Sequence, residues 1–127
     1  DAWVRRALQK GHRPIVRRAR DFATLTPARR HALRIAIKRQ RYAAEFFQTL
    51  FDGRRQAGYL GALRTAQDSL GRANDAHIAS GLLTAVRREA GAMGDFALGW
   101  LAAKQADVAD GECVGSIRAF LKSRPYW

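Results

Sequence analysis

The residues of this chain best suited to chemistry are cations spaced to share one face of a helix. At about 100° per residue, they fall within an arc of roughly 80°. They are Arg30, Arg34, Lys38 and Arg41, with His31 at the margin. The opposite arc is apolar and holds Leu33, Ala36, Ile37, Ala43, Ala44, Phe47, Leu50 and Phe51. We therefore expect one side of this helix to enter the core and the other to meet a strongly anionic partner.

A second set of cations lies nearer the N-terminus and follows a 4-3-4-3 spacing. Its members are Arg6, Lys10, Arg13, Arg17 and Arg20. They form one stripe if the helix that carries them runs through Pro14 without a break. A solvated charged face explains this stripe as well as contact with a ligand does.

Charge and composition narrow the class of protein. Of 23 basic residues, 13 lie in the first 42 positions, and the net charge is +12. Such a balance implies a polyanionic partner, whether nucleic acid, polyphosphate or an acidic membrane surface. A generally arginine-rich composition would not by itself align the charges on helix faces. Apolar residues make up 47% of the sequence, so residues 1–127 are expected to form one globular domain. No stretch of 18 consecutive apolar residues occurs, so we expect no membrane-spanning helix and place the protein in the cytoplasm.

Catalytic constellations are missing from the sequence. There is no glycine-rich loop followed by lysine for a nucleotide, and the histidines lack zinc-binding spacing. Asp75 and His77 form an acid–histidine pair, but no nucleophile accompanies them, so a hydrolytic site is disfavoured. His31 could accept a phosphoryl group as in a phosphorelay, but the helix face around it is more cationic than that role requires. The lone Cys113 is expected to be a small core thiol. We therefore expect a binding protein, not an enzyme, with neither metal nor cofactor.

The pattern of apolar residues, prolines and glycines predicts helices throughout and no strand. The expected helices are 2–10, 14–23, 26–51, 57–90 and 95–122. The first two are read either as separate segments or as one helix kinked at Pro14. Helices joined by short loops favour antiparallel neighbours, so the expected fold is an all-α, up-down four-helix bundle.

Punctuating residues set the expected helix ends. Thr26 and Pro27 are typical of a helix start, and Asp52-Gly53 should close that helix. Gly91 and Gly94 are expected to form the joint before a last helix capped by Asp95. Gly71, inside a long helix, is typical of a close approach to a neighbouring helix or of a bend. We expect the helix that carries His31 to pack against the one that carries Leu70.

Two stretches resemble signatures of the conserved histidine α-helical domain family, called CHAD. Residues 31–47, HALRIAIKRQRYAAEFF, are similar to its pattern His-x-Leu-Arg, then Lys-Arg-Leu-Arg-Tyr, then Glu. Gln40 stands where leucine is usual, at a position expected to face the core. Residues 70–77, LGRANDAH, resemble a second motif, Leu-Gly-x-x-Asn/His-Asp, and residues 124–127, RPYW, resemble the family's usual ending.

This resemblance implies a fold and a ligand. Members of the family have two similar four-helix bundles related by a pseudo-twofold, whose basic residues bind inorganic polyphosphate. They are associated with polyphosphate granules, and some are fused to a triphosphatase domain. One signature, with flanks like those of the second bundle, suggests half of such a domain. A second CHAD-like half or a homodimer would then complete the binding surface.

The chemistry of the cations agrees with that ligand. Polyphosphate is a chain of anions without bases, and guanidinium forks match phosphate oxygens. His31 would donate a hydrogen bond, unless it is a packing histidine satisfied by a neighbouring backbone group. Supporting roles are assigned to Tyr42, Arg72, Asn74, Asp75 and His77, of which Asn74 and Asp75 would orient an arginine of the signature helix.

The main alternative is nonspecific nucleic-acid binding, which the same charge would support. Against it, Tyr42 is the only aromatic residue near the basic face, and Trp3, Phe46, Phe47, Trp100 and Trp127 are expected in the core or at an interface. A third class is a structural module that places a granule partner. Alanine at Arg34, Lys38 or Arg41 should weaken polyphosphate binding, whereas removal of Arg87 or Arg88 should matter less.

Overall fold

The computed structural model is built from helices and short connections. Its three α-helices are α1 (Ala2–Arg20), α2 (Pro27–Phe46) and α3 (Gln56–Lys122), and two 3₁₀ turns, η1 (Phe22–Thr24) and η2 (Gln48–Leu50), follow the first two. No strand occurs along the described backbone, residues 1–127. The expected all-α class is confirmed.

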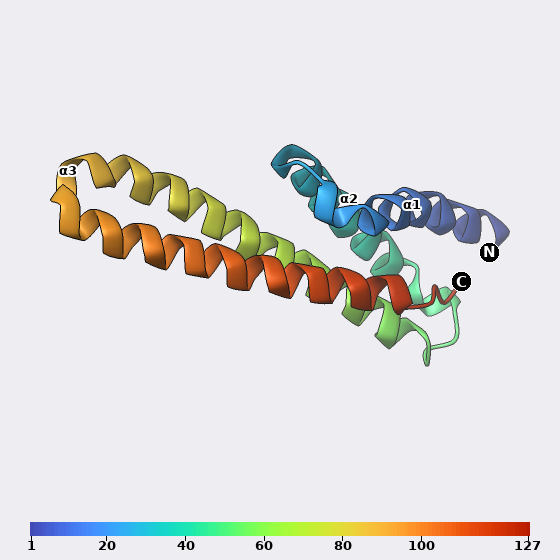
Figure 1. Ribbon diagram of the computed structural model, residues 1–127. Helices are drawn as coiled ribbons and strands as arrows, with labels where there is room; N and C mark the ends of the chain where they lie inside the picture. Colours follow the sequence, from blue (N-terminus) through green and yellow to red (C-terminus); the bar gives the residue numbers. More distant parts are fainter.

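Gly91 divides α3 into two antiparallel arms, residues 56–90 and 92–122 (Figure 1). Its φ of 73° and ψ of 169° are open to glycine but costly for other residues. The side chains of residues 87–90, 92–94 and 97 lie outside what the structure describes. The expected joint over Gly91 and Gly94 is wrong in extent, because a single glycine makes the reversal. Asp95 consequently lies inside the second arm, past the N-cap position at which it was expected.

Helix α1 runs through Pro14 as one helix, so the reading as two separate segments is wrong. It ends at Arg20, short of the expected Ala23. The chain then turns through η1, where the Thr24 hydroxyl donates to the Asp21 carbonyl at 2.9 Å and Phe22 enters the core. Burial of Phe22 thus outweighs continuation of the helix.

Helix α2 begins as its sequence predicts. The Arg29 amide donates to the Thr26 hydroxyl at 3.3 Å, and Pro27 occupies the first turn. It ends at Phe46, well before the expected Asp52-Gly53. The Gln56 side-chain amide donates to the carbonyls of Gln48 and Phe51, at 2.5 and 2.8 Å. These bonds hold the chain in the tighter η2 turn, which replaces the last expected helical turns.

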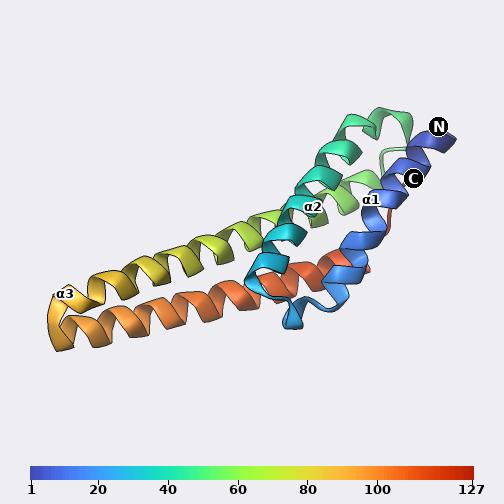
Figure 2. The same ribbon diagram turned by 90° about the horizontal axis from the view of Figure 1, so that it is seen from above.

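The four helical segments, α1, α2 and the two arms of α3, pack together at one end of the molecule. Figures 1 and 2 show α1 and α2 against the base of the α3 hairpin, whose tip extends beyond them, while both chain termini lie at the base. The shared core includes Leu8, Ile15, Leu33, Ile37, Leu63, Leu70, Ile117 and Phe120. The four-helix bundle and the packing of α2 on α3 are confirmed.

Two of three side chains that the sequence predicts to be buried are buried in the structure. Gln40 is buried, as expected for its core-facing position, and donates to the Leu8 carbonyl at 3.0 Å and the Tyr59 hydroxyl at 3.3 Å. Cys113 is also buried, as expected. Leu50, placed on the apolar arc, is exposed because the chain leaves α2 before it.

Large aromatic residues divide between the core and the surface. Trp3, Phe46 and Trp100 are exposed, at 66%, 79% and 57%, so none of them is a core residue of this chain. Phe47 and Trp127 are half-buried against the core. Trp3, Phe46 and Trp100 were expected in the core or at an interface, and of these two expectations only the interface remains for them.

Candidate functional site

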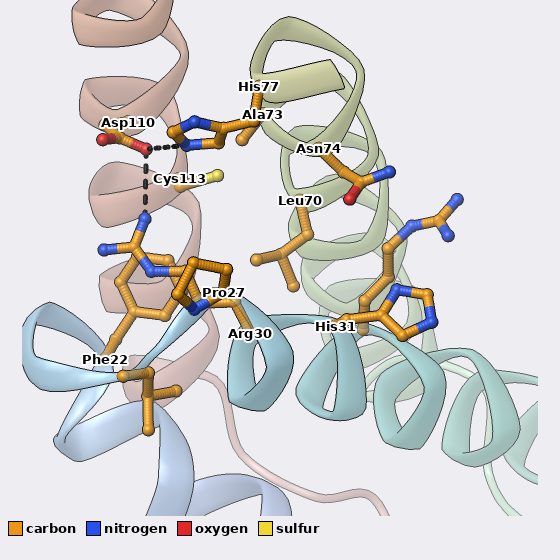
Figure 3. Close-up of a pocket in the computed structure, with 12 residues that line it drawn as sticks. Phe22, Pro27, Arg30, His31, Leu70, Ala73, Asn74, His77, Asp110 and Cys113 are labelled. Atoms are coloured by element: carbon orange, nitrogen blue, oxygen red, sulfur yellow. Dashed lines mark hydrogen bonds and ion pairs between the residues drawn. The ribbon is translucent and has the colours of Figure 1, made fainter. Parts of the chain in front are cut away.

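A pocket of about 350 Å³ lies between α2 and both arms of α3 (Figure 3). Its wall is mostly apolar, with cations and polar groups placed around it. It is lined by Phe22, Leu25, Pro27, Arg30, His31, Arg34, Leu70, Ala73, Asn74, His77, Asp110 and Cys113. We call this the α2 pocket. Few convergent polar groups on an apolar wall are typical of a ligand site.

Arg30 is held on one side of the α2 pocket by an acid from far along the chain. Its Nη1 donates to Asp110 Oδ1 at 3.1 Å, and its guanidinium lies 4.5 Å from the centroid of the Phe22 ring. His77 Nε2 lies 3.8 Å from the same Asp110 oxygen, as Figure 3 shows. Arg30 is therefore compensated by Asp110, although its Nε is buried and has no hydrogen-bond partner among the described residues.

Arg34 is the least satisfied cation of the α2 pocket. Its Nε is buried without a hydrogen-bond partner. Its guanidinium packs over Gly71, where a Cβ would lie 3.5 Å from both Nε and Nη2. No carboxylate among the described residues pairs with Arg34, and a buried donor left unpaired is costly. Gly71 thus marks the close approach that its place in the sequence predicts, and an anion would satisfy the arginine.

His31 and Asn74 complete the polar lining, one from α2 and one from the first arm of α3. Neither makes a hydrogen bond or ion pair with another described residue. His31 is exposed and Asn74 half-buried, so both can reach a bound ligand. Their side chains offer N–H donors, which suit phosphate oxygens.

Lys38 and Arg41 continue the basic row of α2 beyond the pocket, and they differ. Arg41 donates to Glu45 Oε1 and Gln67 Oε1, each at 2.9 Å, whereas Lys38 is exposed and pairs with no described acid. The Tyr42 ring lies 4.5 Å from the Arg41 guanidinium and 5.8 Å from the Lys38 ammonium. Lys38 remains available to an anion, while Arg41 is partly compensated.

Glu45 is the acid that compensates this end of α2. It accepts from Arg41 and from Arg64, whose Nη2 lies 2.7 Å from Oε1. Burial by itself would raise the pKa of Glu45, but the hydrogen bonds from Arg64 and Arg41 outweigh it and lower that pKa. The carboxylate therefore stays charged at neutral pH and keeps Arg41 occupied.

The basic stripe of α1 does not join the α2 pocket. All five of its cations are exposed: Arg6, Lys10, Arg13, Arg17 and Arg20. The last three line a separate hollow of about 480 Å³ together with His12 and Asp21. The stripe thus lies outside the α2 pocket, and both readings of it, solvated face or ligand contact, remain open.

The second motif contributes unequally to the site. Asn74 and His77 line the α2 pocket, whereas Arg72 pairs with Glu112 at 3.0 Å on the exposed side of α3. Asp75 is exposed and contacts no arginine of α2, so it does not orient one. Asp110 has that contact, which sequence reasoning missed.

No local signal singles out Asp110, because it lies 80 residues from Arg30 in the chain. Phe22 and Cys113 were also missed as pocket residues, although both are apolar enough to be expected in a core. Burial raises the pKa of the Cys113 thiol, so it stays protonated and unreactive at neutral pH.

Other kinds of site find no support in the part of the chain that the structure describes. It holds no cluster of three or more histidine, cysteine and acidic side chains that would suit a metal ion. Nor does any of the described helices combine the length and apolarity needed to cross a membrane. The side chains of Arg87 and Arg88, expected to matter less, lie outside the described residues.

Comparison with known proteins agrees with the helical arrangement and the signature on α2. Residues 1–84 match the model of the CHAD domain family. No curated protein and no solved structure matches the chain. The matched segment covers α1, α2 and most of the first arm of α3, and it includes both motifs that line the α2 pocket. The chain therefore belongs to the CHAD domain family.

Proposed function

We propose that this protein binds inorganic polyphosphate along α2, with one phosphate in the α2 pocket. CHAD domains are associated with polyphosphate binding in general. The observation that carries the proposal is Arg34, a cation whose buried Nε has no partner among the described residues. A phosphate oxygen in the pocket would supply the missing acceptor.

The spacing of the free cations supports a chain of anions over a single one. Arg34 and Lys38 stand four residues apart, about 6 Å along the helix axis, and His31 lies one turn before Arg34. A polyphosphate chain along α2 would place phosphates near each of them in turn. The apolar pocket wall strengthens these contacts, because charged hydrogen bonds gain strength where water is scarce.

Nonspecific nucleic-acid binding is the alternative, and the rings near the site disfavour it. Base stacking needs an open aromatic face. The Phe22 ring is buried and faces Arg30, and the Tyr42 ring lies close to Arg41 and Lys38. Phe22 is therefore unavailable to a base, and Tyr42, which is 50% exposed, could stack with one base at most, so binding without base contacts is favoured.

We further propose that a second copy of this chain completes the binding surface, in the cytoplasm and in association with polyphosphate granules. The α3 hairpin exposes apolar side chains beyond the bundle, among them Ile78, Leu82 and Trp100. Exposed apolar side chains tend to be covered by a partner, and a twofold dimer would bring the same patch of two copies together.

The function is tested by titrating the full chain with long-chain polyphosphate and with duplex DNA of equal total charge, at physiological salt. We expect the polyphosphate complex to be tighter and to survive higher salt, and both affinities to fall as salt rises. Polyphosphate recovered after incubation should keep its length, because the proposal is binding without turnover. Equal or tighter binding of DNA would favour the alternative, and shortened chains would show an enzyme.

A further inference from the structure

Asp110 is the only carboxylate among the described residues that line the α2 pocket. It extends from the second arm of α3 toward the cations of α2 (Figure 3). A carboxylate repels any anion that enters a pocket of this size. The presence of a carboxylate in a pocket that is proposed to bind an anion therefore requires an explanation.

The contacts of Asp110 give one. Its Oδ1 accepts from Arg30 at 3.1 Å and lies 3.8 Å from His77 Nε2. The Arg30 and Asp110 side chains are 24% and 42% exposed, so water screens the pair. Pairs this exposed are individually weak and readily exchange one partner for another. Arg30 is thus paired with Asp110, but another anion can replace that carboxylate.

We propose that Asp110 is an internal counter-anion, which occupies Arg30 in the empty pocket and which a ligand phosphate displaces. This inference rests on the proposed polyphosphate function. When phosphate replaces the carboxylate on Arg30, the number of ion pairs at that arginine does not change. An anion that reaches only Arg30 gains little, whereas one that also reaches Arg34 and Lys38 gains new pairs.

Asp110 consequently lowers the affinity of the pocket for any phosphate that must displace it, so that only a ligand with further contacts still binds tightly. Orthophosphate must compete with Asp110 for Arg30 and can add Arg34 and the neutral donors of the pocket, but not the cations farther along α2. Polyphosphate meets the same competitor but adds contacts along α2. Asp110 therefore sets the affinity of the pocket through Arg30, and the additional contacts along α2 favour polyphosphate.

A purely structural role is the competing explanation, since the pair joins α2 to the second arm of α3. The two roles predict opposite signs. If Asp110 competes with the ligand, its neutral isostere should bind polyphosphate more tightly. If Asp110 only holds the arm in place, its loss should loosen the pocket and weaken binding.

The experiment compares Asp110→Asn with Glu112→Gln in the full chain. Both variants remove one negative charge from the same helix, but Glu112 pairs with Arg72 and does not line the α2 pocket. We expect Asp110→Asn to tighten polyphosphate binding by about two- to fivefold, the range expected for releasing a screened pair. Orthophosphate binding should become measurable or tighten by a similar factor. Glu112→Gln should change either affinity by less than about 1.5-fold, because an exposed charge outside the pocket is screened by salt.

A double-mutant cycle with Arg30→Gln isolates the interaction. In the Arg30→Gln background, Asp110→Asn should tighten binding less, because only the repulsion between the carboxylate and the phosphate remains to be removed. Undiminished tightening there, or an Asp110→Asn affinity no higher than that of Glu112→Gln, would overturn the inference.

Carbon-detected NMR of the wild-type chain provides a readout that needs no variant. Polyphosphate should shift the Asp110 carboxyl resonance and leave that of Glu112 in place, and an unmoved Asp110 resonance in the saturated complex would overturn the inference. A wild-type chain that binds no polyphosphate would instead refute the proposed function. The two failures are therefore distinguishable.

Discussion

Gly11 of α1 lies so close to Gln40 of α2 that a Cβ at position 11 would stand 2.2 Å from Gln40 Oε1. The Gln40 side chain cannot easily retreat, because its Nε2 donates to the Leu8 carbonyl and the Tyr59 hydroxyl. This contact brings α1 onto α2 at a buried polar position. The buried amide of Gln40 therefore requires a residue without a side chain at position 11.

Gly11→Ala should destabilise the chain by about 1–3 kcal/mol, because the added methyl group overpacks the contact with Gln40. The matched control is Gly61→Ala in α3, where nothing lies within 4 Å of the added Cβ. That change should stabilise the chain by about 0.5–1 kcal/mol through helix propensity. Urea denaturation measures both, and equal stabilities for the two variants would contradict the close contact.

His12 should make stability depend on pH below neutrality. It packs against the rings of Tyr59, Phe120 and Trp127, with centroids 5.6–5.8 Å away, and burial lowers its pKa below the ordinary 6.5. The unfolded chain then binds the proton more readily than the folded chain does. Stability due to this residue is full above pH 6.5 and is lost as pH falls from there toward the folded-state pKa.

Thermal unfolding between about pH 7.5 and pH 5.5 tests this, because His12 titrates within that interval in the unfolded chain. We expect the wild-type melting temperature to fall across the interval and that of His12→Phe to fall less. His77→Gln, at an exposed histidine, should behave as the wild type. The prediction fails if His12→Phe retains the whole pH dependence.

Arg34→Ala and Lys38→Ala should each weaken polyphosphate binding by about 1–2 kcal/mol, as expected for loss of a charge-assisted contact. Arg41→Ala should weaken it less, because Glu45 and Gln67 already occupy that guanidinium. The control is the double variant Arg54→Ala/Arg55→Ala, which removes two exposed charges from the loop before α3. In titration calorimetry, the affinity of Arg34→Ala/Lys38→Ala for polyphosphate should be well below that of this control. Equal affinities would show that the cationic face of α2 is only a solvated surface.

Changes in the α1 stripe should affect long polyphosphate more than short. Arg13 and Arg17 line a hollow separate from the α2 pocket, so a short chain held on α2 would not reach them. Arg13→Ala/Arg17→Ala should leave tripolyphosphate affinity unchanged and lower the salt dependence for long chains. Unchanged binding of both lengths would show that the stripe is a solvated face.

Dimerisation should be weak without ligand and promoted by polyphosphate, because the basic bundles of two copies repel until an anion lies between them. Light scattering at several protein concentrations, with and without short polyphosphate, measures this. Trp100→Glu, on the exposed side of the hairpin, should weaken the association. A strict monomer under both conditions would contradict the second-copy proposal.

Much of the fold was predictable, because helix periodicity is a local property. The positions of Leu33 and Ile37 in the core, and of Lys38 on the opposite side, follow from 3.6 residues per turn. Thr26 and Pro27 marked the start of α2 for an equally local reason, the unsatisfied amides of a first turn. Pairing of Arg41 with Glu45, four residues later, was also within reach of the sequence.

The sequence by itself thus determined the helices and the cationic face of α2, while the tertiary structure decided which of those cations are free. Arg30 is occupied because Asp110 reaches it from 80 residues away, once the α3 hairpin has reversed at Gly91. Arg34 has no partner among the described side chains, because it packs over Gly71, which brings no acceptor. Contacts between distant segments depend on how the helices cross, and no local pattern in the chain records that.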